Sequence, residues 1–156
     1  QILSKKFDFP LSSKAVEVNQ KMTANIMFEI KDKFKKRIIG KKVLLIGVSY
    51  REDTNDTRYS PAEKVYDFFK KMRCKIEFYD PVVNYWEYTN NYSIEKKYLR
   101  NFDIYVHLIK HQLFKKLKIQ YKNKSLILDL NHTLDRNKRM RILKNKNYDN
   151  YFIGSK

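Results

Sequence analysis

Two arginines precede a segment that is typical of a helix start. Arg51 and Arg58 precede Ser60-Pro61, where Ser60 fits the N-cap and Pro61 the first helical position. The free amides and the dipole of a helix N-terminus favour an anion, and planar guanidinium groups fit phosphate oxygens. The segment therefore predicts a site for a phosphate-bearing ligand. The alternative is that Asp56 and Arg58 form an ion pair that only braces the loop.

Other polar segments are expected near the same site. Asp80-Pro81 and residues 129–132 each follow an apolar run, and the carboxyl ends of parallel strands share one edge of a sheet. A dinucleotide fingerprint needs Gly-x-Gly-x-x-Gly after the first strand, but Gly47 stands alone there. We therefore expect any nucleotide to bind without the usual NAD pyrophosphate loop.

The remaining reactive side chains are weaker candidates. Cys74 lies at the amino end of a predicted strand, and we interpret it as a small buried residue rather than a nucleophile. His107 lies inside an apolar run and is predicted to be a core histidine, whereas His111 is a candidate cap of a short helix. One cysteine and three scattered histidines give no zinc spacing, so no metal site is expected.

Hydrophobic periodicity predicts the elements that position these residues. Apolar residues recur every four positions over residues 12–37, which predicts a long amphipathic helix ended by Gly40. Other helices are predicted from Ser60, over residues 111–117 and in the basic segment near the C-terminus. Predicted strands alternate with them, at residues 42–48, 75–79, 104–109, 125–130 and 151–153. The pattern predicts an α/β fold, a Rossmann-like or flavodoxin-like parallel sheet with helices on both faces, preceded by a connecting or dimerisation helix.

Composition limits the class of partner. The 156 residues carry 34 Lys and Arg against 17 Asp and Glu, a net charge of +17 that suggests a nucleic acid, an anionic membrane or a phosphorylated small molecule. The longest apolar run, residues 43–48, is far shorter than the roughly 20 residues of a membrane helix. The single cysteine fits a reducing cytoplasm. A C-terminal basic cluster suggests either nucleic-acid contact or a solvated helix face: Arg136, Lys138, Arg139 and Arg141.

One combination of motifs resembles a known family. The Asp-Thr-Arg-Tyr-Ser-Pro sequence of residues 56–61, followed one helix later by Tyr79-Asp80-Pro81, resembles the C-terminal, UDP-binding domain of the UDP-glucose/GDP-mannose dehydrogenase family. Residues 18–22 are similar to the start of the family's long central helix. Residues 111–114, Asp129 and residues 152–154 are also similar to family positions, so the resemblance extends over nearly all of the chain from about residue 15.

This resemblance implies part of an enzyme. Full members oxidise the C6 alcohol of a nucleotide-sugar to a carboxylate, with two NAD molecules and a cysteine that holds the intermediate. Residues 1–38 would end the central dimerisation domain, and residues 39–156 would form the UDP-sugar-binding domain. The NAD domain and the catalytic cysteine would precede Gln1, so we expect a piece of a larger enzyme with no catalytic residue and no activity alone. A cytoplasmic homodimer through the helix of residues 15–37 is also expected, without a membrane.

The resemblance also assigns roles to individual residues. Tyr50 and Arg51 fall where the family has an aromatic residue and a lysine that contact the UDP-sugar. Arg58 falls where an arginine approaches the NAD pyrophosphate. Asn131 and His132 stand where the family has a substrate-contacting arginine, and they are included as substrate-binding candidates. Two other interpretations remain open: a basic nucleic-acid-binding module and a dimerisation fragment that binds no ligand.

Overall fold

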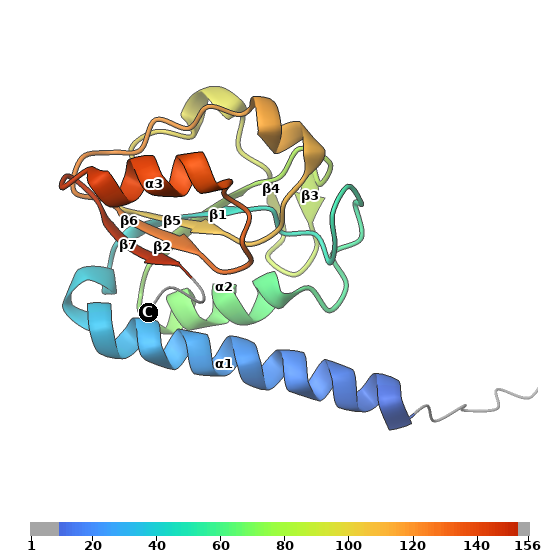
Figure 1. Ribbon diagram of the computed structural model, residues 1–156. Coiled ribbons are helices and arrows are strands. Elements are labelled where there is room, and N and C mark those ends of the chain that lie inside the picture. Colours follow the sequence, from blue (N-terminus) through green and yellow to red (C-terminus); the bar gives the residue numbers. More distant parts are fainter. Residues whose placement is uncertain (1–9, 153–156) are drawn as a thin grey trace, which may run out of the picture.

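A parallel sheet forms the centre of the chain in the computed structural model, which describes the backbone of residues 10–152 and the side chains from Lys21 (Figure 1). Its five strands have the spatial order β2-β1-β5-β6-β7, and every pair is parallel. They are β1 (Lys42–Ile46), β2 (Lys75–Tyr79), β5 (Ile104–His107), β6 (Leu126–Asp129) and β7 (Asp149–Phe152). This topology confirms the predicted Rossmann-like α/β class. The strand order reverses between β1 and β5, and ligands of such sheets bind beyond the carboxyl ends at that point.

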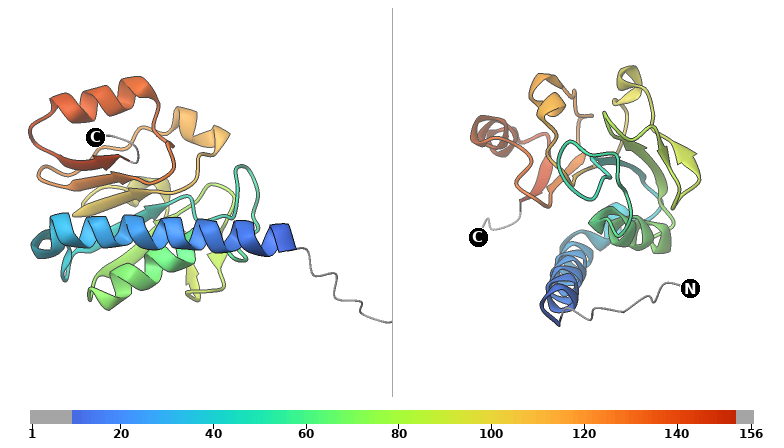
Figure 2. Two further views of the ribbon diagram at one scale, coloured as in Figure 1. Left: turned by 60° about the horizontal axis from the view of Figure 1, so that its bottom comes forward. Right: turned by 90° about the vertical axis from the view of Figure 1, so that its right-hand side faces the viewer.

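The two faces of the sheet are covered differently. The helices α1 (Pro10–Ile38) and α2 (Pro61–Lys71) lie side by side on one face, as Figures 1 and 2 show. On the other face lie α3 (Arg136–Lys144) and two short 3₁₀ helices, η1 (Lys96–Tyr98) and η2 (Gln112–Lys116). The central strands are buried on both faces, which explains their continuous apolar runs.

The long first helix packs against the core of the sheet. Ile30 and Ile38 of α1 are fully buried in the same cluster as side chains of β1, β5 and β6. The Tyr151 hydroxyl of β7 donates a hydrogen bond of 2.6 Å to the Glu29 carboxylate. Gly40 follows the helix with a φ of +72°, as predicted for a glycine that ends a helix.

Several boundaries differ from the predictions. Residues 112–116 form a 3₁₀ helix instead of an α-helix, and the last strand begins at Asp149 instead of Tyr151. A hairpin of β3 (Tyr85–Trp86) and β4 (Asn91–Tyr92) was not predicted, because its strands are too short for a period-two pattern. Residues 153–154 and the side chains of residues 18–20, on which part of the resemblance depends, lie outside the described residues.

Candidate functional site

The site begins at a glycine that directs the chain away from β1. Gly47 has a φ of +81°, and a Cβ atom there would lie 2.6 Å from the backbone oxygen of Ile109. Any other residue would combine backbone strain with a clash against the segment after β5. Gly47 therefore sets the start of the loop of residues 47–60, which we call the ligand loop.

Asp80 anchors the ligand loop. Its fully buried carboxylate accepts hydrogen bonds from the amides of Val48 at 2.8 Å and Ser49 at 3.3 Å. The other carboxylate oxygen accepts from the amides of Val82 at 2.9 Å and Val83 at 3.1 Å. One side chain thus holds the segments after β1 and β2 together, which gives a physical reason for an aspartate at the end of β2.

His111 adds the segment after β5 to this network. Its Nε2 lies 3.2 Å from both the Asp80 carboxylate and the Ser49 hydroxyl, and its Nδ1 accepts a 2.9 Å hydrogen bond from the Asp53 amide. Asp53 in turn accepts from the Gln112 amide at 2.9 Å. Burial opposes the charged form of His111, but hydrogen bonding to Asp80 and its negative charge outweigh this and raise the pKa of the imidazole. The sequence predicted His111 as a candidate cap and as part of a segment similar to family positions. It does occupy the N-cap position of η2, but its side chain makes no capping hydrogen bond.

The ligand loop presents three of the predicted site residues at the surface. Tyr50 is 48% exposed, and its amide donates to the Asp56 carbonyl at 2.7 Å. Arg51 is exposed, and its guanidinium has no hydrogen bond or ion pair among the described side chains. Arg58 forms two hydrogen bonds with the Asp56 carboxylate, at 3.0 and 2.8 Å, and holds the pKa of that carboxyl down at about 2. The bracing ion pair considered as an alternative is therefore present, and Arg51 is the free cation of this loop.

The N-terminus of α2 is capped from within the chain. The Ser60 hydroxyl accepts a hydrogen bond from the Ala62 amide and donates one to the Ser49 carbonyl, both at 3.1 Å. Glu63, at the third helical position, does not close a capping box, and the Ser60 amide donates to the Thr57 carbonyl instead. The cap therefore ties the helix start to the ligand loop.

Asn131 and His132 lie at the same edge of the sheet, after β6. Both are exposed, and His132 has a φ of +50° with its Nδ1 2.9 Å from the Arg139 guanidinium. Arg139 also pairs with the buried Asp129 carboxylate at 2.7 Å. Sequence reasoning placed Arg139 only in a general basic cluster, because its partner lies ten residues earlier in the chain. Among the described residues, no hydrogen bond or ion pair joins Asn131 or His132 to the ligand loop, and β5 separates the two groups.

Candidates for covalent or metal chemistry are Cys74 and the acidic and histidine side chains at their observed positions. Cys74 is half-buried near the amino edge, where its thiol donates to the Ile38 carbonyl at 3.0 Å, and burial raises its pKa. Among the side chains described, those of residues 21–152, no cluster of three or more His, Cys, Asp or Glu could hold a metal ion. None of the helices described in the structure has the length and apolar character to span a membrane. The exposed guanidinium of Arg51 gives the arrangement a group that can bind an anion.

Comparisons with known proteins agree with this arrangement. Residues 44–136 match the family model described as UDP-glucose/GDP-mannose dehydrogenase family, UDP binding domain. A UDP-N-acetyl-D-mannosamine dehydrogenase of Methanococcus aeolicus is 30% identical over 136 residues, which is 81% of this chain and 30% of the relative. Its namesake from Methanococcus vannielii is 34% identical over 132 residues, or 79% of this chain and 30% of the relative. The chain thus spans about 30% of the length of these curated relatives.

Solved structures share the fold. An NDP-N-acetyl-D-galactosaminuronic acid dehydrogenase from Methanosarcina mazei superposes with a TM-score of 0.68 at 21% identity, over 88% of this chain and 29% of that one. The UDP-N-acetyl-mannosamine dehydrogenase Cap5O from Staphylococcus aureus gives 0.65 at 22% identity, over 98% of this chain and 35% of the other.

Proposed function

The chain belongs to the UDP-glucose/GDP-mannose dehydrogenase family as its UDP binding domain, and on this premise we propose that it is the nucleotide-sugar-binding C-terminal part of an NAD-dependent UDP-sugar 6-dehydrogenase. The observation that carries the proposal is the free guanidinium of Arg51 on a loop that Asp80 and His111 fix at the strand-order reversal. An unpaired cation on a loop whose backbone is already held suits a diphosphate, because the backbone loses little conformational entropy on binding.

Each exposed residue has a role in this proposal. Arg51 binds the diphosphate, and Tyr50 packs its ring against the nucleotide. Asn131 and His132 reach the sugar end from the loop after β6, and their amide and imidazole groups offer hydrogen bonds. Arg58 turns toward the NAD pyrophosphate when it leaves Asp56. The relatives named as UDP-N-acetyl-D-mannosamine dehydrogenases support UDP-N-acetylmannosamine as the nucleotide-sugar.

We propose that the main NAD site does not lie at the turn after β1. Gly47 is the only glycine of the turn after β1, and the backbone of Ile109 fills the space beside it. A pyrophosphate therefore cannot approach the turn as it does in a dinucleotide-binding loop. When bound to the whole enzyme, NAD supplies the hydride acceptor, while the present residues bind and orient the nucleotide-sugar. We propose that this chain is inactive alone, dimeric through α1 and cytoplasmic.

Isothermal titration calorimetry on the 156-residue chain tests the binding role. We expect saturable binding of UDP and of UDP-N-acetylmannosamine, and weakening of about tenfold in Arg51→Ala because one charge-assisted contact is lost. Arg100→Ala, an exposed arginine outside the ligand loop, is the matched control and should bind as the unchanged chain does. A DNA duplex of mixed sequence tests the nucleic-acid alternative, which the net charge of +17 motivates. Tight DNA binding without any response to UDP would refute the proposal.

A further inference from the structure

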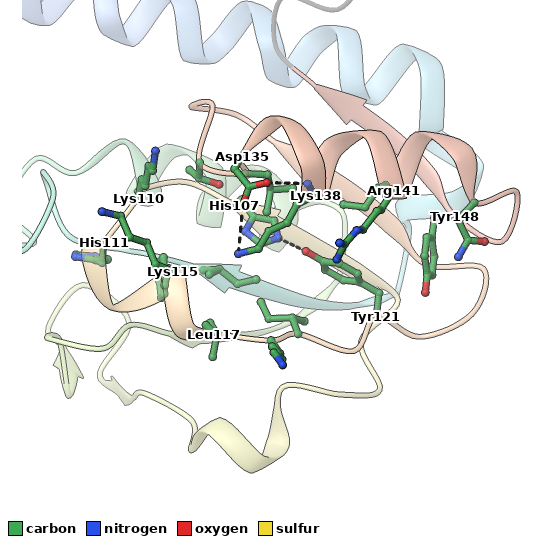
Figure 3. Close-up of a pocket in the computed structure, with 18 residues that line it drawn as sticks. His107, Lys110, His111, Lys115, Leu117, Tyr121, Asp135, Lys138, Arg141 and Tyr148 are labelled. Carbon is green, nitrogen blue, oxygen red and sulfur yellow. Dashed lines mark hydrogen bonds and ion pairs between the residues drawn. The ribbon is translucent and has the colours of Figure 1, made fainter.

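A groove lies over β5 and β6, and His111, which is hydrogen-bonded to the ligand loop, is among its lining residues. The groove is bounded by η2 and the segment that follows on one side and by α3 on the other, and its volume is about 680 Å³ (Figure 3). Sites for small organic molecules usually measure roughly 300–1,000 Å³. The groove exists because the connection from β5 to β6 contains a short 3₁₀ helix, which covers less of the sheet than a full α-helix would.

Cations dominate the lining of the groove. Asp135 is the one carboxylate in the lining. Five basic residues face the groove: Lys110, Lys115, Lys118, Lys138 and Arg141. Lys138 lies 3.8 Å from Asp135, and the other four have no carboxylate partner among the described side chains. Lys138 and Arg141 are three residues apart on α3, and both extend into the groove (Figure 3). Two adjacent cations in this position suit a phosphate group.

The rest of the lining is mainly aliphatic and aromatic, and it includes one buried polar pair. The ring of Tyr121 meets that of Tyr148 edge to face at 5.9 Å, and Phe114 also lines the groove. The His107 imidazole is 4% exposed, and its Nε2 lies 3.0 Å from the Tyr121 hydroxyl. Burial lowers the pKa of His107 to about 4, so the imidazole is neutral near pH 7. The groove thus offers ring surfaces and a neutral polar pair beside its cations.

We propose that this groove binds a nucleoside phosphate at a second site, with the phosphate on Lys138 and Arg141 and the nucleoside against Tyr121 and Tyr148. None of the five residues assigned to substrate or NAD lines the groove: Tyr50, Arg51, Arg58, Asn131 and His132. His111, which helps to hold the ligand loop, does line the groove, so the two sites adjoin but use different residues for binding.

The test uses ADP as the probe, with adenosine and inorganic pyrophosphate as its two halves. The titrations use the Arg51→Ala variant, so that the ligand loop contributes little to the measured binding. Calorimetry and NMR of the aromatic side chains monitor them. We expect saturable ADP binding that shifts the resonances of His107, Tyr121 and Tyr148. Adenosine and pyrophosphate should each bind about tenfold or more weakly, because each makes only part of the contacts.

Matched substitutions separate a site from general attraction by a basic chain. Adding Lys138→Gln and Arg141→Gln should weaken ADP binding at least about tenfold. Adding Arg136→Gln and Lys144→Gln instead removes the same charge from positions of α3 outside the groove lining and should change the affinity less than about twofold. Circular dichroism checks that both variants fold. Equal weakening by the two pairs, an absence of shifts in the groove, or pyrophosphate binding as tight as ADP binding would overturn the proposal.

Discussion

Gly47 is the residue whose replacement by alanine should most directly distort the ligand loop. Gly47→Ala places a methyl group 2.6 Å from a backbone oxygen at a φ of +81°, and we expect a loss of about 3 kcal/mol in the free energy of unfolding. Gly40→Ala is the control, because Gly40 has a φ of +72° but nothing within 4 Å of the added atom; its cost should be about 1 kcal/mol. Urea unfolding measures both, and equal losses would contradict the close approach of Ile109.

Asp80 determines the position of the loop through its charge. Asp80→Asn keeps the shape of the side chain but turns an NH₂ group toward amides that need an acceptor, and we expect a loss of about 3 kcal/mol. UDP affinity should fall as well, although Asp80 is buried away from the ligand. Asp135→Asn is the matched control, because asparagine caps a helix as well as aspartate does. If Asp80→Asn leaves both stability and UDP affinity unchanged, the anchoring role is refuted.

Burial of His107 should make the free energy of unfolding fall as the pH is lowered from 7 to 5. Its folded pKa, about 4, lies below the ordinary value of 6.5, so its contribution is present above pH 6.5 and is lost as the pH falls. The loss should reach about 2 kcal/mol by pH 5. The charge of the neighbouring Asp129 favours protonation of His107, and that of Lys138 opposes it. Burial has the largest effect on the pKa of His107.

The measurement is a comparison of unfolding free energies at pH 7 and pH 5. His107→Gln should lose less stability between these two values than the unchanged chain does. His132→Gln, an exposed position, should not change the difference. Because the raised pKa of His111 acts in the opposite direction, only the difference between variants is informative. A pH profile identical in all three chains would contradict the burial of a neutral His107.

At the scale of elements, α1 has both a buried and an exposed apolar part. Ile30 and Ile38 pack in the core, whereas Phe28 is 71% and Met22 51% exposed. If α1 is a dimerisation helix, Phe28→Asp with Met22→Asp should convert a dimer to a monomer in light scattering without unfolding the chain. The exposed Leu113→Asp, on η2, is the control and should leave the mass unchanged. An unchanged mass in the α1 variant would refute the proposed role of the helix.

The predictability of each element depended on its length and burial. The strands around Leu44 and Ile127 were predictable because burial on both faces leaves continuous apolar runs. The start of α2 was predictable from Ser60-Pro61, since capping chemistry is local. The hairpin at Tyr85–Trp86 and the 3₁₀ form of η2 were not, because short elements depend on tertiary contacts.

The parts of the site that depend on neighbouring residues in the sequence were predictable, because such interactions are local. The ligand loop carries local motifs, so Arg51 and the ion pair between Asp56 and Arg58 could be anticipated from sequence spacing. The links from His111 to Asp80 and from Arg139 to Asp129 join residues 31 and 10 positions apart. Such partners are set by the strand order, which a single sequence does not specify.

At the scale of the whole molecule, the parallel sheet brings the loops after β1, β2 and β5 to one edge, where one hydrogen-bond network joins them. The net charge of +17 has no single explanation in this arrangement. Some cations are paired with carboxylates, as Arg139 is with Asp129, while others face the groove beside α3. The proposed nucleotide-sugar site lies at the edge of the sheet where the strand order reverses.

NMR titration of the ¹⁵N-labelled chain with UDP-N-acetylmannosamine tests this claim most directly. The account predicts saturable shifts of the amides of Tyr50 and Arg51, with smaller ones at Asn131 and His132. Arg51→Ala should reduce them at the same ligand concentration. Saturable shifts confined to other parts of the chain, or none at all, would contradict nucleotide-sugar binding by the ligand loop.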